Sequence, residues 1–389
     1  MEGKLEDFKL PIIVDIGSGE VKAGFSGEEK PKIVFKNFIG EPKYKKVLDL
    51  FNKENHQEIK ESYIGQDCDK YMGIIKLRYP VRHGIFSNEP DILSLFNYLY
   101  SKLNLNPEEI TQHPVLITEP LLNPYSNREK IANLLFDDLG IPALFFASQP
   151  ILSLFSTSST TGTVLESGAG VTQSCVVYEG YSLPNSYERF DYGGEDVSEY
   201  LKHLLRKKGY QFFNSTDFRL VNEIKEYSCF CIPDNKKIDI NSAKKGLNKF
   251  PINYYLPDGT TISIGEERLM APEILFDTGI IGKEYLSFPD IIMSSINKID
   301  IQLRYKSYEN ILLSGGNTCI KGLLDKLDDE IKNRTYKHLN INIKTVPNPN
   351  FCCWNGGNII STLEIFKRML TSKKEWNERG NNVVHIKTI

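Results

Sequence analysis

Two short glycine turns, each preceded by an acidic residue, carry the residues of this chain that are best suited to chemistry. The first lies in residues 14–22, VDIGSGEVK, and the second in residues 165–173, LESGAGVTQ. Glycine lets backbone N–H groups approach an anion with no Cβ in the way, which suits a polyphosphate. A single turn of this kind is usually an ordinary β-turn. Two copies in matching register predict one nucleotide gripped from both sides of a cleft.

Apolar and β-branched segments flank both turns and predict the strands that hold them. Residues 12–14 and 21–25 surround the first turn, and residues 163–165 and 173–178 surround the second. Each set therefore predicts a β-hairpin. The Ser, Thr and Gly cluster at 156–162 fits a hinge between two halves that follow the same plan.

Strand and helix patterns alternate in both halves, which predicts α/β layers. We expect helices at 92–99, 127–136, 197–208 and 217–229, strands at 113–118, 143–146 and 310–314, an irregular polar stretch at 233–249, a turn at 257–259 and a last helix at 367–379.

Composition is that of an ordinary globular protein. The 389 residues are 40% hydrophobic and 25% charged, enough for two or three lobes with a substantial core. A formal charge of −3 gives no reason to expect binding to nucleic acid or insertion into a membrane. The longest apolar stretch, 141–155, is too short to span a bilayer. Seven cysteines, an odd number with no C-x-x-C pair, indicate reduced thiols in the cytoplasm or nucleus.

Many further segments, in the same order along the chain, resemble the actin and actin-related protein family over essentially the whole length. The matching segments are 15–22, 78–85, 113–119, 123–129, 149–154, 178–180, 224–226, 256–259, 313–316 and 354–357. Within the family, residues 205–210, 271–276 and 373–389 are most similar to centractin.

The resemblance implies an α/β, actin-like two-lobed fold built from two homologous, ribonuclease-H-like halves with a nucleotide cleft between them. It also implies four subdomains. Subdomain 1 would comprise 1–36, 80–156 and 352–389; subdomain 2, 37–79 with a mobile loop at 43–61; subdomain 3, 157–192 and 284–351; and subdomain 4, 193–283.

Matching positions also imply a site for ATP or ADP with Mg²⁺. Asp15 and Glu166 would hold a hydrated Mg²⁺, a cation that prefers carboxylates and keeps most of its waters. Gln149 would position the attacking water. The residues that would contact the nucleotide are Gly17, Ser18, Gly19, Lys22, Gly168, Ala169, Gly170 and Val171 around the phosphates, and Gly194, Lys225, Glu226, Gly315, Gly316 and Asn350 around the remainder.

Three departures from the family pattern fall where chemistry would occur. Glu166 and Ala169 each stand where the family has aspartate, and Gln173 stands where it has a histidine that helps to order the attacking water. An amide cannot relay a proton at neutral pH, and losing a positioned acid or base slows a reaction by roughly 10²–10⁴-fold. With Gln149, Glu166 and Gln173 as the catalytic set, we expect hydrolysis to be very slow or absent.

Departures also occur on the adenosine side. Asn222, Ile320 and Asn350 replace cationic or aromatic residues, which predicts weaker contact with the base. The alternative is that residues elsewhere in the pocket compensate for these replacements and restore the contact with the base.

Two classes of function fit these residues. The preferred one is a structural subunit of a cytoskeletal filament or of a multi-subunit complex similar to dynactin. Its partners would be other actin-family subunits and cytoskeletal complex proteins. Its expected location is the cytoplasm, and the nucleus is a possible second location. The alternatives are an active ATPase of the same superfamily, or a subunit of a branch-nucleating or chromatin-remodelling complex. The partner contact is expected in the charged loop at 43–61, through the apolar residues Val47, Leu48, Leu50 and Phe51, against a surface that includes Phe155 and the segment near Trp376.

Overall fold

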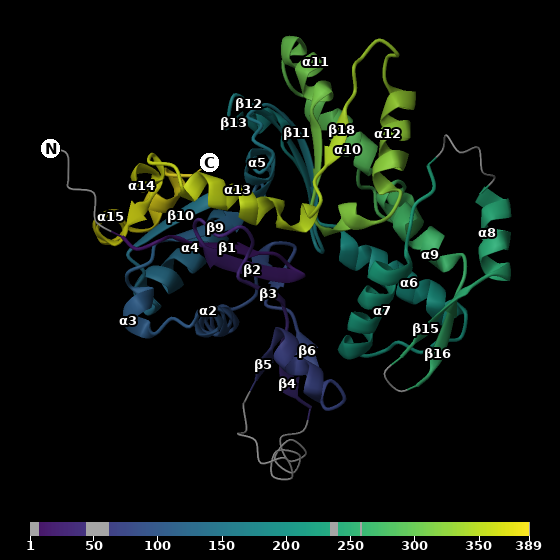
Figure 1. Ribbon diagram of the computed structural model, residues 1–389, viewed down its shortest axis with the longest axis horizontal. Coiled ribbons are helices and arrows are strands. Elements are labelled where there is room, and N and C mark those ends of the chain that lie inside the picture. Colours follow the sequence, from purple (N-terminus) through teal and green to yellow (C-terminus); the bar gives the residue numbers. More distant parts are fainter. Residues whose placement is uncertain (1–7, 44–61, 234–239, 257–258, 389) are drawn as a thin grey trace.

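The computed structural model describes residues 8–43, 62–233, 240–256 and 259–388, which form two α/β lobes side by side (Figure 1). The N-terminal part of the chain and the C-terminal segment build the first lobe, and the middle of the chain builds the second. The loop expected at 43–61 lies outside the described residues apart from Lys43, and so does most of the turn expected at 257–259.

The first lobe is built on a sheet in which a hairpin continues into parallel strands. Strand β1 pairs antiparallel with β2 and parallel with β9, which pairs parallel with β10. In spatial order the strands are β19 (Thr371–Ser372), β10 (Ala143–Ser148), β9 (Val115–Glu119), β1 (Ile12–Ile16), β2 (Glu20–Phe25) and β3 (Ile33–Lys36).

The second lobe repeats this plan. Strand β11 pairs antiparallel with β12 and parallel with β17, which pairs parallel with β18. The order is β13 (Tyr181–Ser182), β12 (Thr172–Tyr178), β11 (Gly162–Ser167), β17 (Ile311–Ser314) and β18 (Ile343–Thr345), with β14 (Glu188–Phe190) also paired to β12. The two predicted hairpins and their repetition are therefore confirmed.

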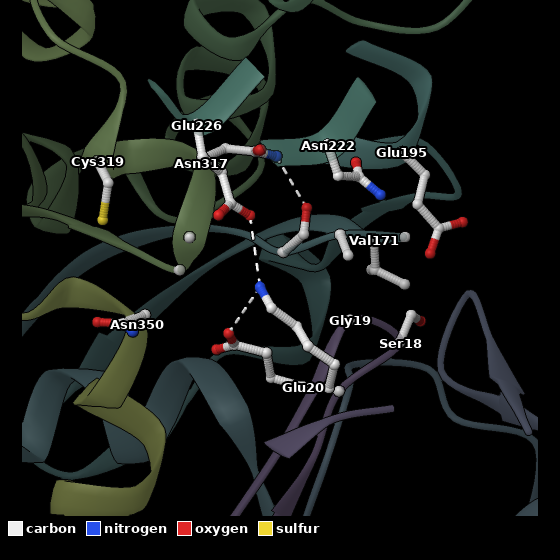
Figure 2. Close-up of a pocket in the computed structure, with 18 of the residues that line it drawn as sticks. Ser18, Gly19, Glu20, Val171, Glu195, Asn222, Glu226, Asn317, Cys319 and Asn350 are labelled. Atoms are coloured by element: carbon white, nitrogen blue, oxygen red, sulfur yellow. Dashed lines mark hydrogen bonds and ion pairs between the residues drawn. The ribbon is translucent and has the colours of Figure 1, made fainter. Parts of the chain in front are cut away.

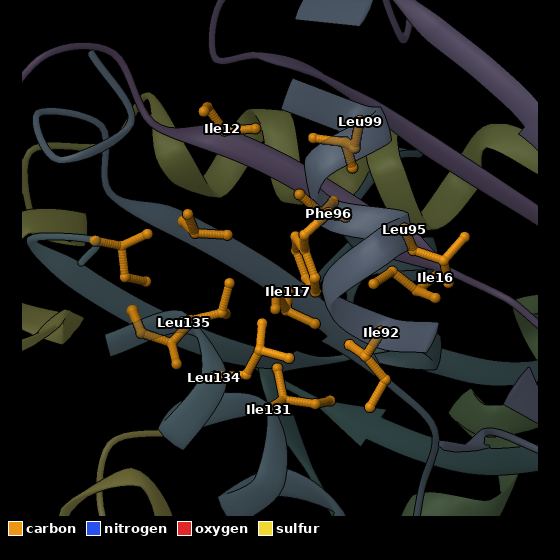
Figure 3. Packing of buried hydrophobic residues seen from close by; sticks show 14 of the residues in the cluster. Ile12, Ile16, Ile92, Leu95, Phe96, Leu99, Ile117, Ile131, Leu134 and Leu135 are labelled. Atoms are coloured by element: carbon orange, nitrogen blue, oxygen red, sulfur yellow. The ribbon is translucent and has the colours of Figure 1, made fainter. Parts of the chain in front are cut away.

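Helix α2 (Glu89–Leu103) shows how apolar spacing fixes a helix against the first sheet. Asn88 caps its first turn by accepting a hydrogen bond from the Asp91 N–H, and Asn104 ends it in the left-handed conformation. The apolar residues between them recur every three or four positions and enter the core shown in Figure 3. The buried ones are Ile92, Leu95, Phe96, Leu99 and Leu103.

The other helices cover the two sheets or lie at their edges (Figure 1). In the first lobe they are α3 (Pro107–Ile110), α4 (Tyr125–Asn133), α5 (Gln149–Phe155), α13 (Cys352–Ser361), α14 (Phe366–Met369) and α15 (Lys373–Arg379). In the second they are α6 (Gly194–Lys207), α7 (Ser215–Ser228), α8 (Ile240–Lys249), α9 (Glu267–Met270), α10 (Phe288–Asn297), α11 (Ile301–Glu309) and α12 (Leu323–Arg334).

Two small sheets extend the lobes. Strands β4 (Ile39–Pro42), β5 (Tyr63–Ile64) and β6 (Ile75–Arg78) lie beyond the first sheet, and the hairpin of β15 (Ile252–Tyr255) and β16 (Thr261–Ile264) lies beside α7 and α8. A short ribbon of β7 (Val81–Arg82) and β8 (Ile85–Phe86) follows β6.

Close packing of α5 against α13 fixes the start of α5. A Cβ on Gly356 would lie 1.8 Å from the Leu152 carbonyl oxygen, so only glycine allows this approach. The Trp354 indole N–H in the same helix donates to the Ile13 carbonyl at 3.2 Å, which ties α13 to β1. Gln149, the first residue of α5, is thereby held beside the end of β1.

Two expectations are wrong. Residues 240–249 of the stretch expected to be irregular form α8, and the single helix expected at 367–379 is interrupted by β19, which pairs with β10. The side chain of Trp376 is buried and stacks on Phe136 with ring centroids 5.1 Å apart, so the docking surface expected near it would be formed by its exposed neighbours. Within the described ranges, none of the helices combines the length and the apolar character that a bilayer-spanning segment needs.

Candidate functional site

One cavity of about 560 Å³ lies between the lobes, within the size range of small-molecule sites. It brings together every residue that the sequence assigns to the site. These are Asp15, Gly17, Ser18, Gly19, Lys22, Gln149, Glu166, Gly168, Ala169, Gly170, Val171, Gln173, Gly194, Lys225, Glu226, Gly315, Gly316 and Asn350.

The first hairpin presents its tip to this cavity. The Gly17 N–H donates to the Glu20 carbonyl at 2.9 Å and so closes the turn. Asn37 braces the tip from outside, because its backbone N–H donates to Gly19 O at 2.9 Å and its side-chain amide donates to Gly17 O at 2.8 Å. Within the described part of the chain, the N–H groups of Ser18 and Gly19 have no acceptor and are available to an anion.

The second hairpin is closed and braced in the same way. The Gly168 N–H donates to the Val171 carbonyl at 2.9 Å. The Asn317 side-chain amide donates to Gly168 O and to the Ser167 hydroxyl, both at 2.8 Å. Among the described residues, no acceptor is found for the N–H groups of Ala169 and Gly170.

The two tips lie against each other, as Figure 2 shows for Ser18 and Gly19 on one side and Val171 on the other. A Cβ on Gly19 would lie 2.9 Å from the Ala169 Cβ, and one on Gly170 would lie 2.9 Å from the Ser18 Oγ. A side chain at either position would therefore force its neighbour to shift, and both tips line the same cavity.

The side chains beneath the first tip form a charged pair. Lys22 Nζ lies 3.1 Å from Asp15 Oδ2, and both side chains are buried. Burial disfavours the ammonium, but Asp15 and Glu20 outweigh that effect and raise the pKa of Lys22. The Thr118 hydroxyl donates to Asp15 Oδ1 at 2.6 Å, so the carboxylate is held in place.

Beneath the second tip, Glu166 is buried, and no cation of the described residues forms an ion pair with it. Burial raises the pKa of its carboxyl to about 7, although the hydrogen bond from Cys353 lowers it. The Cys353 thiol donates to Glu166 Oε1 at 2.9 Å, and the Gln173 amide donates to Oε2 at 3.5 Å. Both oxygens of Glu166 therefore have partners within the protein.

An amide pair links the two hairpins. Gln173 Nε2 donates to Gln149 Oε1 at 3.1 Å, and Gln173 Oε1 accepts from the Leu121 N–H at 2.7 Å. Gln149 Nε2 in turn donates to Asp15 Oδ1 at 3.4 Å and to the Thr118 hydroxyl at 3.3 Å. The side chain of Gln149 is thus held from both ends.

The opposite end of the cavity is lined by amides and one half-buried lysine. Lys225 Nζ donates to the Gly194 carbonyl at 2.8 Å, and burial lowers the pKa of its ammonium. Figure 2 shows Asn222 and Glu226 on the α7 side of the pocket and Asn350 across from them. Gly315, with φ at +90°, lets the chain pass close to β11, because a Cβ there would lie 2.3 Å from the Ser167 carbonyl oxygen.

A hydrated Mg²⁺ fits these residues better than a directly coordinated metal. Asp15 and Glu166 face the cavity from different lobes. Among the described residues, no group of three or more His, Cys, Asp or Glu side chains could hold a metal ion. The two carboxylates could bind Mg²⁺ through water when phosphate oxygens complete its coordination.

The sequence reasoning missed residues that hold the site together, among them Asn37, Thr118, Asn317 and Cys353. Asn317 follows directly after Gly315 and Gly316, and that proximity could have drawn attention to it. Asn37 lies in the short connection between β3 and β4 and offered no such signal.

Comparison with known proteins agrees with this geometry. The sequence profile of the family described as "Actin" matches residues 7–389. An "Actin-like protein" of Neurospora crassa is 41% identical over 380 residues, which cover 97% of each of the two chains.

Proposed function

Because this chain belongs to the actin family, we propose that it binds ATP or ADP with Mg²⁺ between its lobes and hydrolyses ATP very slowly or not at all. The observation that carries the binding proposal is the pair of facing hairpin tips, whose free N–H groups at Ser18, Gly19, Ala169 and Gly170 line one cavity. Lys22 supplies the positive charge that a polyphosphate needs.

The residues at the two ends of the cavity would contact different parts of the nucleotide. The hairpin tips would hold the phosphates, and Lys225, Glu226 and Asn350 would lie near the ribose and base. Bound Mg²⁺, held through water by Asp15 and Glu166, would neutralise phosphate charge.

Slow hydrolysis is supported by the amide pair. Gln149 is the residue expected to orient water, and its carbonyl oxygen already accepts from Gln173 at 3.1 Å. Neither amide can take a proton from water. The protein therefore offers no acid–base relay at the position where the family has histidine.

An active ATPase is the second candidate, and one observation favours it. The pKa of Glu166, raised to about 7 by burial, is close to the value that suits a general base at neutral pH. Both of its carboxylate oxygens, however, accept hydrogen bonds from Cys353 and Gln173, which leaves the base poorly placed to accept a proton from water. We therefore prefer the weakly hydrolysing form.

Mg-ATP should raise the Tm and give a heat of binding in calorimetry, because a ligand that binds only the native state stabilises it. Gly170→Val should abolish both signals, since its side chain would fill the contact with Ser18. Gly246→Ala, in open space on α8, is the matched control and should keep them. If Mg-ATP leaves both signals unchanged in the wild type, the binding proposal is wrong.

The hydrolysis proposal is tested by restoring the family's side chains. Glu166→Asp, Ala169→Asp and Gln173→His, made together because such groups act as a unit, should raise phosphate release by about 10²-fold. Adding Gln149→Ala to this variant should remove the gain. Robust turnover by the wild type, free of contaminating actin, would refute the proposal.

We propose that the protein is a structural subunit of a cytoskeletal filament or complex in the cytoplasm, where it contacts other actin-family subunits. In this role the protein would be similar to centractin, and the complex would be similar to dynactin. The short centractin-like segments, such as 205–210, support the subfamily assignment. The apolar residues of the loop at 43–61, outside the described residues, are the expected contact.

Replacing two of those apolar residues tests the contact. Burying one such side chain fully is worth roughly 1.5–3 kcal/mol, so Leu48→Asp with Phe51→Asp should abolish co-purification with partners while the protein stays folded. Lys53→Asp changes the charge of the same loop without removing an apolar group and should have little effect. Unchanged co-purification of the double variant would exclude this contact.

A further inference from the structure

Helix α8 and strand β15 form a locally basic segment of the second lobe. The whole chain has 47 Lys and Arg residues against 50 Asp and Glu residues, so it is slightly acidic. Residues 240–256, by contrast, contain lysines at positions 244, 245 and 249 and no acidic residue. All three lysines lie on α8. Positive charge is therefore concentrated on one short helix.

The described part of the chain does not neutralise these lysines. Lys245 and Lys249 are exposed and Lys244 is half-buried, and among the described residues no carboxylate forms an ion pair with any of them. Lys208 in the same lobe shows the contrast, because its Nζ lies 2.9 Å from Glu267 Oε1. The charges on α8 are therefore available to an anionic partner.

Exposed aromatic rings accompany the lysines. Phe250 directly follows α8 and is 71% exposed, and Tyr255 at the end of β15 is 72% exposed. Lys249 Nζ lies 5.6 Å from the centroid of the Phe250 ring, so charge and ring share one surface. Lysines beside exposed aromatic rings are typical of segments that lie in the interface between lipid headgroups and acyl chains.

The segment lies at the outer edge of the second lobe (Figure 1). None of residues 240–256 lines the cavity between the lobes. Helix α8 is tied to the lobe by Asn248, which accepts from the Glu266 N–H at 3.0 Å, and by the half-buried Ala243 and Leu247. A helix at an outer edge can meet a flat surface along its whole length, which favours a bilayer over a peptide as the occupant.

We propose that α8, with the exposed rings of Phe250 and Tyr255, attaches this protein to the surface of a bilayer that contains anionic phospholipid. The lysines would lie over the lipid headgroups, and the two rings would enter the interface. Attachment of this kind is to the surface and requires no membrane-spanning helix. It does not depend on the proposed nucleotide binding.

The number of lysines predicts the size of the effect. Each lysine near an anionic bilayer should contribute about fivefold to the affinity, so Lys244→Gln, Lys245→Gln and Lys249→Gln together should weaken binding about 100-fold. High salt should weaken wild-type binding, because it screens exposed charges. Phe250→Ala should weaken binding less and leave its salt dependence unchanged.

Co-sedimentation of the full chain with vesicles tests the proposal. The wild type should sediment with vesicles of equal parts phosphatidylcholine and phosphatidylserine, and not with vesicles of phosphatidylcholine alone. The matched control removes the same charge elsewhere in the second lobe, through Lys306→Gln, Lys337→Gln and Lys344→Gln. These three lysines lie outside residues 240–256, so the control should bind like the wild type.

A fluorescent reporter tests the contact itself. Phe250→Trp places an indole at the exposed ring position, whereas Trp354 and Trp376 are buried and give a constant background. Its emission should shift to shorter wavelength with the anionic vesicles only, because the ring leaves water. Circular dichroism verifies that each variant is folded. Lys249→Gln alone, about fivefold weaker in binding, replaces the triple variant if that one folds poorly.

The proposal is overturned if the wild type does not sediment with the anionic vesicles, or if the emission of Phe250→Trp does not change. It is also overturned if the control variant loses as much affinity as the α8 variant, because binding would then follow net charge alone. Binding of a polyglutamate peptide without binding of vesicles would identify an acidic peptide as the occupant in place of the bilayer.

Discussion

The hairpins β1–β2 and β11–β12 have the same backbone but different chemistry. Asp15 pairs with Lys22 across the first ladder, and Glu166 pairs with Gln173 at the equivalent positions of the second. The first pair is an ion pair at 3.1 Å, whereas the second is an amide-to-carboxyl contact at 3.5 Å. Both turns are nevertheless closed by the same hydrogen bond, because that bond joins main-chain groups.

The difference indicates which property each hairpin can still supply. Both tips offer backbone N–H groups, so both can hold an anion. Only the first keeps a paired charge beneath the tip, while the second keeps a carboxyl whose pKa is raised to about 7 and an amide in place of an acid–base group. Binding therefore depends on both hairpins, and chemistry is limited by the second.

The largest expected effect is on stability at the paired positions. Lys22→Met leaves the buried Asp15 carboxylate without a cation and should lower the unfolding free energy by about 3–5 kcal/mol. Gln173→Met removes the hydrogen bonds of an uncharged amide, including the one it accepts from the Leu121 N–H, and should lower the unfolding free energy by about 1–3 kcal/mol. Urea denaturation measures both. Equal losses would mean that the two pairs do not differ as described.

A second effect of similar size depends on pH. Because the pKa of Glu166 is raised above its unfolded value to about 7, the fold favours the protonated carboxyl. The stability that the protonated Glu166 carboxyl contributes is fully present below about pH 4.5 and is lost as the pH rises through 7. The unfolding free energy should therefore fall by about 3 kcal/mol over this range. Urea denaturation of the wild type and Glu166→Gln across this range should show the wild type losing stability relative to the variant. A constant difference would contradict the raised pKa.

The smallest effect compares the two braces. Asn37→Ala and Asn317→Ala each remove hydrogen bonds to the carbonyl of a turn glycine and should lower stability by about 1–2 kcal/mol. Each should also weaken ATP binding about tenfold, because the tip that it braces becomes less ordered. Asn310→Ala is the control, since Asn310 donates to the Thr161 carbonyl at 2.6 Å outside the cavity. If it weakens binding as much, the braces have no special role.

Sequence patterns predicted the hairpins because local residues determine them. Apolar strands flank each glycine turn, and the matching register placed Asp15 and Glu166 at equivalent positions. The matching register also predicted a cleft between the hairpins, whereas the residues on the adenosine side of the cavity were anticipated only from the resemblance. The amide pair and the thiol contact of Glu166 were not, since they join residues distant in the chain.

The missed elements have physical reasons. Helix α8 has only three apolar residues, but Ile240, Ala243 and Leu247 recur at helical spacing, so part of it could have been predicted. Asn248 near its end accepts from the Glu266 N–H at 3.0 Å, a contact that the sequence does not reveal. Strand β19 forms only because Ser372 meets Ala143 of β10. The start of α15 was visible in principle, because Ser372 and Glu375 have the spacing of a capping box.

The nature of the bound nucleotide after long incubation tests the central claim most directly. The protein would be loaded with Mg-ATP, freed of excess ligand and kept under conditions in which actin filaments hydrolyse ATP, and the bound nucleotide would then be analysed by chromatography. We predict that one nucleotide per chain is retained and that it is still ATP. Recovery of ADP and phosphate, or of no nucleotide at all, would contradict the account of two binding hairpins of which the second does not support hydrolysis.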